Sequence, residues 1–109
     1  MSEARIVLTT IGVHEKAEAL ARALVERRLA ACVNIVGPIR SIYRWQGKVE
    51  DEQEFLLIIK TTAERTGELA SAFGELHPYE LPERVELKIE GGSAEYLGWI
   101  VGETVRANQ

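Results

Sequence analysis

The chain has 109 residues, of which 46% are hydrophobic and 28% charged, and its 13 basic and 17 acidic side chains give a formal net charge of −4. This length predicts one domain, residues 1–109, that buries a core without metal or disulfide support. The mildly acidic balance argues against a nucleic-acid or anionic-membrane partner. The single cysteine excludes an internal disulfide, and no apolar run approaches the about 18 residues of a membrane span. We therefore expect a cytoplasmic protein.

The first half of the chain predicts a strand, a helix and a long strand. Arg5–Thr10 is a short β-branched run, which is typical of a strand. His14–Arg28 has apolar residues at helical spacing, acidic residues early and basic residues late, which favours a helix. Ala31–Trp45 is rich in valine, isoleucine and aromatic residues, and Gly37-Pro38 within it indicates a bend or bulge in one long strand.

The second half predicts a returning strand, a helix, a last strand and a terminal helix. Gln46-Gly47 indicates a tight turn, and Lys48–Thr61 then returns as a strand that is apolar on both faces near its end. Glu64–Leu76 favours a second helix, and the prolines that follow it exclude helix up to a last strand at Val85–Ile89. Ser93 is a good N-cap for a terminal helix.

This order predicts an α+β fold, a ferredoxin-like β-α-β-β-α-β sandwich with an extended hairpin between its second and third strands and a C-terminal helix. Alternating strand directions place Thr9, the helix start at His14 and the helix exit at His77 at one end. Cys32 and Lys60 lie at the other end, so a metal site that joins Cys32 and His77 within one chain is disfavoured.

No other predicted strand or helix of the chain packs against the outer half of the hairpin. It carries Ile42, Tyr43 and Trp45, and its opposite strand is acidic between Glu50 and Glu54. Isolated two-stranded ribbons are marginal in water, and exposed apolar patches mark contact sites. We therefore expect another chain to cover these side chains.

Each candidate binding or catalytic residue can also be explained by a purely structural role. Cys32 fits a small buried hydrophobe better than a nucleophile. His77 fits either a helix-end residue or a ligand, and His14 fits a solvent-facing position. Lys60 fits a salt bridge or an anion contact. The acidic stretch from Glu50 to Glu54 fits a solvated face or a contact with a partner better than a cation site.

Catalysis has no support in the sequence. The chain contains no Ser/His/Asp set, nucleotide-binding glycine loop or zinc-protease motif, so we expect no enzyme. Tyr43 and Trp45 could stack on a ligand, but rigid aromatic side chains also anchor subunit contacts.

Five runs cover nearly the whole chain in a distinctive order and spacing: LVERRLAACVNIV, IRSIYRWQGKVE, LLIIKT, LHPYELPE and EYLGWI. In these runs the chain resembles the CutA family of divalent-cation tolerance proteins. The resemblance implies a ferredoxin-like subunit in a compact homotrimer, similar to the PII signalling proteins, with strands pairing between subunits. It also implies a response to copper or other divalent metal ions, a cytoplasmic location and no established enzymatic reaction.

The resemblance carries over only part of the family's copper site. Its assigned ligands are a cysteine late in the first strand and two adjacent histidines just before Pro-Tyr. The matching positions are Thr9, Leu76 and His77, so only His77 keeps a ligand-type side chain. Threonine is a weak copper ligand and leucine cannot coordinate. The resemblance therefore implies no obligatory cofactor, and weak or indirect binding of a divalent ion such as copper with His77 as candidate ligand.

Three functions follow as alternatives. The first is a trimeric divalent-cation tolerance protein with a cleft between subunits near His77. The second is a PII-like signalling trimer that binds a small anionic metabolite or nucleotide between subunits, with Lys60 or Arg44 supplying positive charge. The third is a scaffold that recruits another protein. The side chains expected around the cleft are Tyr43, Trp45, Lys60, Tyr79 and Glu80.

Overall fold

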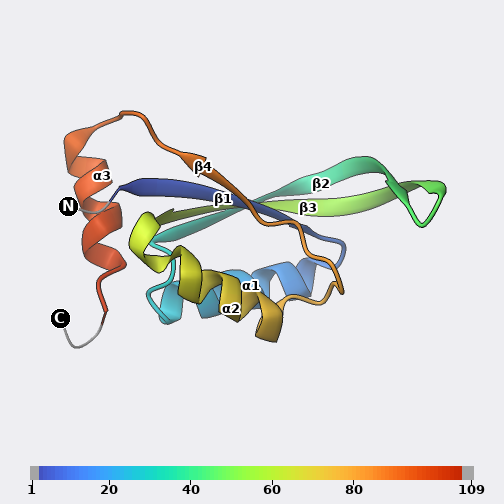
Figure 1. The fold of residues 1–109 in the computed structure, drawn as a ribbon, viewed down its shortest axis with the longest axis horizontal. Coiled ribbons are helices and arrows are strands. Elements are labelled where there is room, and N and C mark those ends of the chain that lie inside the picture. The colour runs from blue at the N-terminus through green and yellow to red at the C-terminus, as the bar shows by residue number, and fades with distance from the viewer. Residues whose placement is uncertain (1–2, 107–109) are drawn as a thin grey trace.

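A four-stranded antiparallel sheet with two helices on one face forms the body of the protein (Figure 1). The computed structural model describes residues 3–106. The strand order is β2-β3-β1-β4, and α3 stands across one end of the sheet. The elements are β1 (Ala4–Ile11), α1 (His14–Glu26), β2 (Cys32–Trp45), β3 (Lys48–Thr62), a 3-10 turn (Ala63–Arg65), α2 (Thr66–Leu76), β4 (Val85–Lys88) and α3 (Ala94–Glu103).

This architecture confirms the predicted α+β ferredoxin-like fold with its extended hairpin and C-terminal helix. The first helix ends at Glu26, two residues before its predicted end, because Arg28 has a positive φ of 59°. Ser93 caps α3 as predicted, since its side chain accepts a hydrogen bond from the Tyr96 backbone N–H at 3.2 Å. None of the helices within residues 3–106 is both long and apolar enough to cross a membrane.

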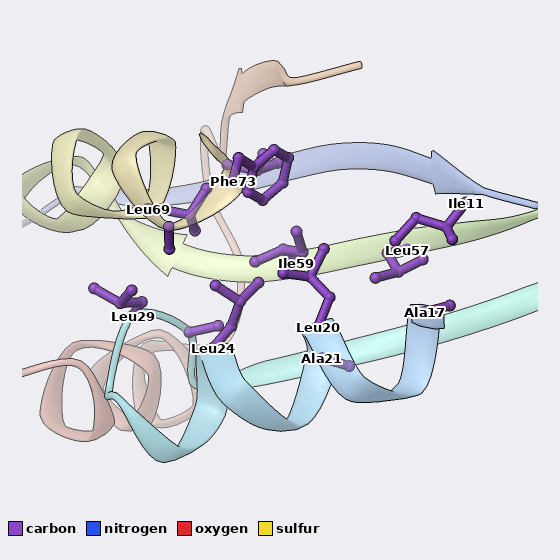
Figure 2. Close-up of a cluster of buried hydrophobic side chains, with 13 residues drawn as sticks. Ile11, Ala17, Leu20, Ala21, Leu24, Leu29, Leu57, Ile59, Leu69 and Phe73 are labelled. Carbon is purple, nitrogen blue, oxygen red and sulfur yellow. The ribbon is translucent and has the colours of Figure 1, made fainter. Parts of the chain in front are cut away.

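The hydrophobic core lies between the two helices and the sheet. Figure 2 shows side chains of α1 and α2 pointing toward β3, where Leu57 and Ile59 are fully buried. Full burial of one such side chain stabilises a fold by about 1.5–3 kcal/mol. This packing holds α1 and α2 on a single face of the sheet. The core residues of the helices are Ala17, Leu20, Ala21, Leu24, Leu69, Ala72 and Phe73.

The β2–β3 hairpin extends beyond the rest of the sheet (Figure 1). Strand β1 ends at Ile11, opposite Phe55, and the outer parts of β2 and β3 continue as a two-stranded ribbon. Gln46 and Gly47 both have positive φ values, 49° and 80°, which suits the tight turn at the tip. The ladder shifts register between Val36 and Ile39, which confirms the predicted irregularity at Gly37-Pro38.

The ribbon leaves large apolar side chains uncovered within the chain, as predicted. Ile42 is 65% exposed, and Tyr43 and Trp45 are 41% and 39% exposed. The paired strand, the loop after α2 and Thr10 of β1 line a cleft together with side chains of this ribbon, as described below.

The sheet face away from α1 and α2 is also apolar. Directly paired residues of antiparallel strands project to the same face, and Ile6 and Leu8 pair with Leu87 and Val85. No helix packs over the middle of this face (Figure 1). We call it the open sheet face, and its apolar members are Ile6, Leu8, Leu56, Ile58, Val85 and Leu87.

The surroundings of Cys32 and Lys60 differ from those that the sequence predicts. Cys32 is half-buried rather than buried, because its register with Lys60 places both on the open sheet face, away from the helices. Lys60 donates a hydrogen bond to the Tyr96 hydroxyl at 3.3 Å instead of forming the expected salt bridge. His14 is exposed, as expected, and its ring meets Phe55 edge-on at 5.1 Å.

Candidate functional site

A cleft of about 760 Å³ opens between the ribbon and the loop that follows α2. This volume lies within the range of small-molecule sites in proteins, about 300–1,000 Å³. We call it the hairpin cleft. Its lining residues are Thr10, Ser41, Ile42, Tyr43, Trp45, Glu52, Glu54, Pro78, Tyr79, Glu80, Leu81 and Glu83.

His77 anchors the start of the loop that follows α2 through two hydrogen bonds. Its ring is buried, and the Tyr79 backbone N–H donates to Nδ1 at 3.1 Å. The neutral ring therefore carries its proton on Nε2 and donates it to the Thr9 hydroxyl oxygen, at 2.9 Å. Burial lowers the pKa of His77, against opposing effects of a hydrogen bond with the Thr10 backbone and of the Glu54 charge. The contact between Thr9 and His77 confirms that both lie at the same end of the sheet.

Tyr79 ties the loop to the ribbon. Its hydroxyl donates to Glu54 Oε2 at 2.6 Å, and Glu54 is only 6% exposed. Burial, together with the hydrogen bond and the charge of Glu54, raises the pKa of the Tyr79 phenol well above its usual value. The loop approaches Gly12 so closely that a Cβ there would lie 3.1 Å from the Tyr79 hydroxyl oxygen. A glycine at the end of β1 thus leaves room for this hydrogen bond.

The charged side chains that line the hairpin cleft are all acidic. Four of its lining residues are glutamates and none is lysine or arginine. Burial and then the nearby Glu54 charge raise the pKa of Glu83. Burial also raises the pKa of Tyr43, and the charges of the neighbouring carboxylates raise it further. Burial is the larger cause of both shifts, and the charges of neighbouring carboxylates act in the same direction.

The structure brings together four of the five side chains expected around a cleft: Tyr43, Trp45, Tyr79 and Glu80. Lys60, the fifth, does not line it, because Lys60 pairs with Cys32 at the far end of the sheet. Arg44, which follows Tyr43 along β2, is not among the lining residues either. Neither candidate positive charge therefore belongs to the cleft of this chain.

Sequence reasoning missed Glu52, Glu54 and Glu83 as members of the site. The acidic stretch was interpreted as a solvated face, yet Glu54 is buried. Glu52 and Glu54 can be identified from the alternation of side chains along a strand, because Glu50, Glu52 and Glu54 then project to one side of the ribbon. The register confirms this, because Glu50 pairs with Tyr43.

The residues around His77 do not fit the copper site that the family resemblance implies. Both ring nitrogens of His77 already take part in hydrogen bonds, and Leu76 packs against the hydrophobic core. Between residues 3 and 106, no three histidine, cysteine, aspartate or glutamate side chains group closely enough to hold a metal ion. A tight metal site made by one chain is therefore not present in this part of the protein.

Comparisons with known proteins agree with the fold and with the order of its motifs. The family described as CutA1 divalent ion tolerance protein matches residues 5–103. The divalent-cation tolerance protein CutA of Thermus thermophilus is 52% identical over 95 residues, which make up 87% of this chain and 92% of that protein. A solved structure of the T. thermophilus protein has a TM-score of 0.91 at 49% identity, and the match covers 94% of this chain and 99% of that one.

Animal and plant relatives are longer. The CutA homologue of Xenopus laevis is 48% identical over 84 residues, which are 77% of this chain and 56% of that protein. This chain thus spans about half the length of that animal relative. The match nevertheless includes most of the fold described above, and the family match extends from β1 to α3. The chain belongs to the CutA family of divalent-cation tolerance proteins.

Proposed function

We propose that the protein acts as a homotrimer in the tolerance of divalent cations and that its role toward metal ions is indirect. Support for the tolerance role comes from the family and from the bacterial relatives, which are named divalent-cation tolerance proteins. These names describe tolerance rather than a reaction, and we propose no catalytic step. We also propose a cytoplasmic location, as the family resemblance implies.

The observation that supports self-association is the uncovered apolar surface. Val85 and Leu87 on the open sheet face are 46% and 44% exposed, and Ile42 on the ribbon is 65% exposed. Burial of apolar surface contributes about 25 cal/mol per Å², so contact between copies across these residues stabilises an assembly. The number of copies, three, rests on the family resemblance.

The indirect role toward metals is supported by the hydrogen bonds of His77. A metal ion at Nδ1 would displace the Tyr79 backbone N–H, and one at Nε2 would displace the Thr9 hydroxyl. Each exchange leaves a buried polar group without its partner, which costs about 1–3 kcal/mol.

The charges around the hairpin cleft do not support the alternative function, which is binding of an anionic ligand. An anion in the hairpin cleft would face Glu54 and Glu83 without a lysine or arginine among the lining residues. Like charges at short range repel, so the cleft disfavours phosphate and carboxylate ligands.

Calorimetric titration of Cu(II) and Zn(II) tests the indirect role. We expect weak heats that are the same for the wild type and for His77→Gln, because His77 has no free nitrogen for a metal. His14→Gln is the matched control, since His14 is the other histidine and is exposed on α1. Tight binding that is lost in His77→Gln and retained in His14→Gln would contradict the proposal.

A growth assay tests the tolerance role itself. The chain is expressed in a bacterial strain that lacks its own CutA protein and is sensitive to raised copper. We expect both the wild type and His77→Gln to restore growth. Failure of the folded wild-type protein to restore growth would exclude the role in that host.

A further inference from the structure

A second pocket, of about 270 Å³, lies where the end of α3 meets the 3-10 turn that leads into α2. It is at the opposite end of the sheet from the hairpin cleft, because Thr62 pairs with Ala4 at the start of β1, whereas the cleft includes Thr10 near the end of β1. Sites for drug-sized molecules have about 300–1,000 Å³, so this volume suits a small ion. We call it the α3 pocket, and its polar lining residues are Thr62, Glu64, Arg65, Thr104 and Arg106.

Arg65 is a buried cation with unused hydrogen-bond donors. Its side chain is 6% exposed, its Nε donates to the Arg28 carbonyl at 3.2 Å, and its Nη1 donates to Glu68 Oε1 at 2.9 Å. The remaining nitrogen, Nη2, has no hydrogen-bond acceptor within residues 3–106. Because no fully buried side-chain nitrogen in this range lacks a partner, Nη2 must be accessible, and the α3 pocket that Arg65 lines provides this access. The N–H groups of Nη2 are therefore available to an acceptor in the pocket.

The hydroxyl of Thr62 is a second available donor. Thr62 ends β3, lines the α3 pocket and is only 2% exposed. Its hydroxyl makes no hydrogen bond with the residues that the structure describes, whereas the neighbouring Thr61 hydroxyl donates to the Leu29 carbonyl at 2.7 Å. A polar group in a buried position is unfavourable without a hydrogen-bond partner, so Thr62 also favours a ligand with acceptor oxygens.

Two guanidinium groups share one carboxylate beside the α3 pocket. Arg65 Nη1 and Arg106 Nη2 both donate to Glu68 Oε1, at 2.9 and 2.6 Å. Both arginines line the pocket, and Glu68 does not. Among the described lining residues Glu64 alone is acidic, and it is exposed, so solvent screens its charge more than the charge of the buried Arg65. This arrangement favours an anion whose oxygens face Arg65 and Thr62, because guanidinium donors match the oxygens of an oxyanion.

We propose that the α3 pocket binds a phosphate ion. Arg65 Nη2 and the Thr62 hydroxyl donate hydrogen bonds to its oxygens, and the positive charge of Arg106 stabilises it. This site goes beyond the proposed role in tolerance of divalent cations and does not depend on it. A carboxylate of a neighbouring copy offers similar oxygens, and the experiment separates the two sources.

Calorimetric titration of inorganic phosphate into the 109-residue chain at constant ionic strength tests the proposal. We expect saturable binding of one phosphate per chain. Thr62→Val keeps the branched shape but removes the hydroxyl, and it is expected to weaken binding about tenfold, the effect of one lost hydrogen bond to a charged group. Because this hydroxyl has no partner in the described chain, Thr62→Val should leave urea unfolding without phosphate unchanged. This measurement separates loss of the ligand from loss of the fold.

Glu64→Gln changes the affinity in the opposite direction. It removes a negative charge from the lining of the α3 pocket, so it is expected to tighten phosphate binding. Glu26→Gln, which removes the same charge from an exposed site on α1, is the matched control and leaves the affinity unchanged.

Two results would overturn the proposal. The first is the absence of saturable phosphate binding to the wild type. If Thr62→Val also changes the mass of the assembly in that case, a carboxylate of a neighbouring copy is the occupant. The second is equal phosphate affinity of the wild type, Thr62→Val and Glu64→Gln, which would place the bound ion elsewhere on the protein.

Discussion

Ile58→Glu is expected to convert the proposed trimer into separate chains. Ile58 lies at the centre of the open sheet face, where it pairs with Leu8 on one side and Asn34 on the other. In an assembly that covers this face, the new carboxylate would lose water without gaining a positive partner, which costs several kcal/mol for each ion. Size-exclusion chromatography with light scattering would then report the mass of one chain.

The control for this experiment is a glutamate placed outside the proposed contact. Val25 is 42% exposed on α1, a helix that covers the opposite face of the sheet. Val25→Glu introduces the same charge and should leave the mass unchanged. An assembly that tolerates Ile58→Glu without any loss of mass would show that copies meet through another surface.

Leu57→Ala is expected to lower the free energy of unfolding by about 2–5 kcal/mol. Leu57 neighbours Ile58 along β3 but points to the opposite face, where it is fully buried beneath the helices (Figure 2). The shorter side chain removes apolar contacts and leaves a cavity that the packed core only partly fills. Urea unfolding, followed by circular dichroism at a fixed protein concentration, measures the change.

Val25→Ala provides the comparison for the core variant, since it truncates an exposed apolar side chain and should change stability by less than about 0.5 kcal/mol. Together, Leu57→Ala and Ile58→Glu test the helix-covered face and the open sheet face of β3 independently. If Leu57→Ala unfolded at the same urea concentration as the wild type, the assignment of the core to the helix-covered face would be wrong.

Local patterns in the sequence were enough to predict the elements and their topology. The helical spacing of Leu20 and Leu24 and the tight turn at Gln46-Gly47 depend on residues close together in the chain. Strand directions then predicted that Thr9 and His77, 68 residues apart, lie at one end, and the structure shows them in contact.

The sequence was less informative about which surfaces the chain itself covers. The run from Phe55 to Lys60 is apolar on both faces, which identifies a central strand but does not say which face receives helices. Cys32 was predicted to be buried because its neighbours are apolar and free cysteine is usually buried, yet its register places it on the uncovered side. Register between distant strands decides such exposure, and periodicity alone does not supply it.

The cleft between subunits that the sequence predicts stays a prediction, but the structure shows which of its residues meet within one chain. Tyr43, Trp45, Tyr79 and Glu80 line the hairpin cleft, because the first two follow the predicted hairpin and the others lie in the loop after α2. Lys60 lies at the far end of the sheet, and Glu54 of the ribbon lines the cleft although it was not named. These placements depend on long-range contacts, which local sequence patterns do not supply.

We propose that this chain covers its apolar surfaces only by assembly with copies of itself. Sedimentation velocity of the wild-type protein at micromolar concentration measures this assembly. The proposed trimer predicts a single species with three times the mass of one chain. A folded species with the mass of one chain, stable in the same buffer, would contradict the claim, because the open sheet face and the ribbon would then remain exposed to water.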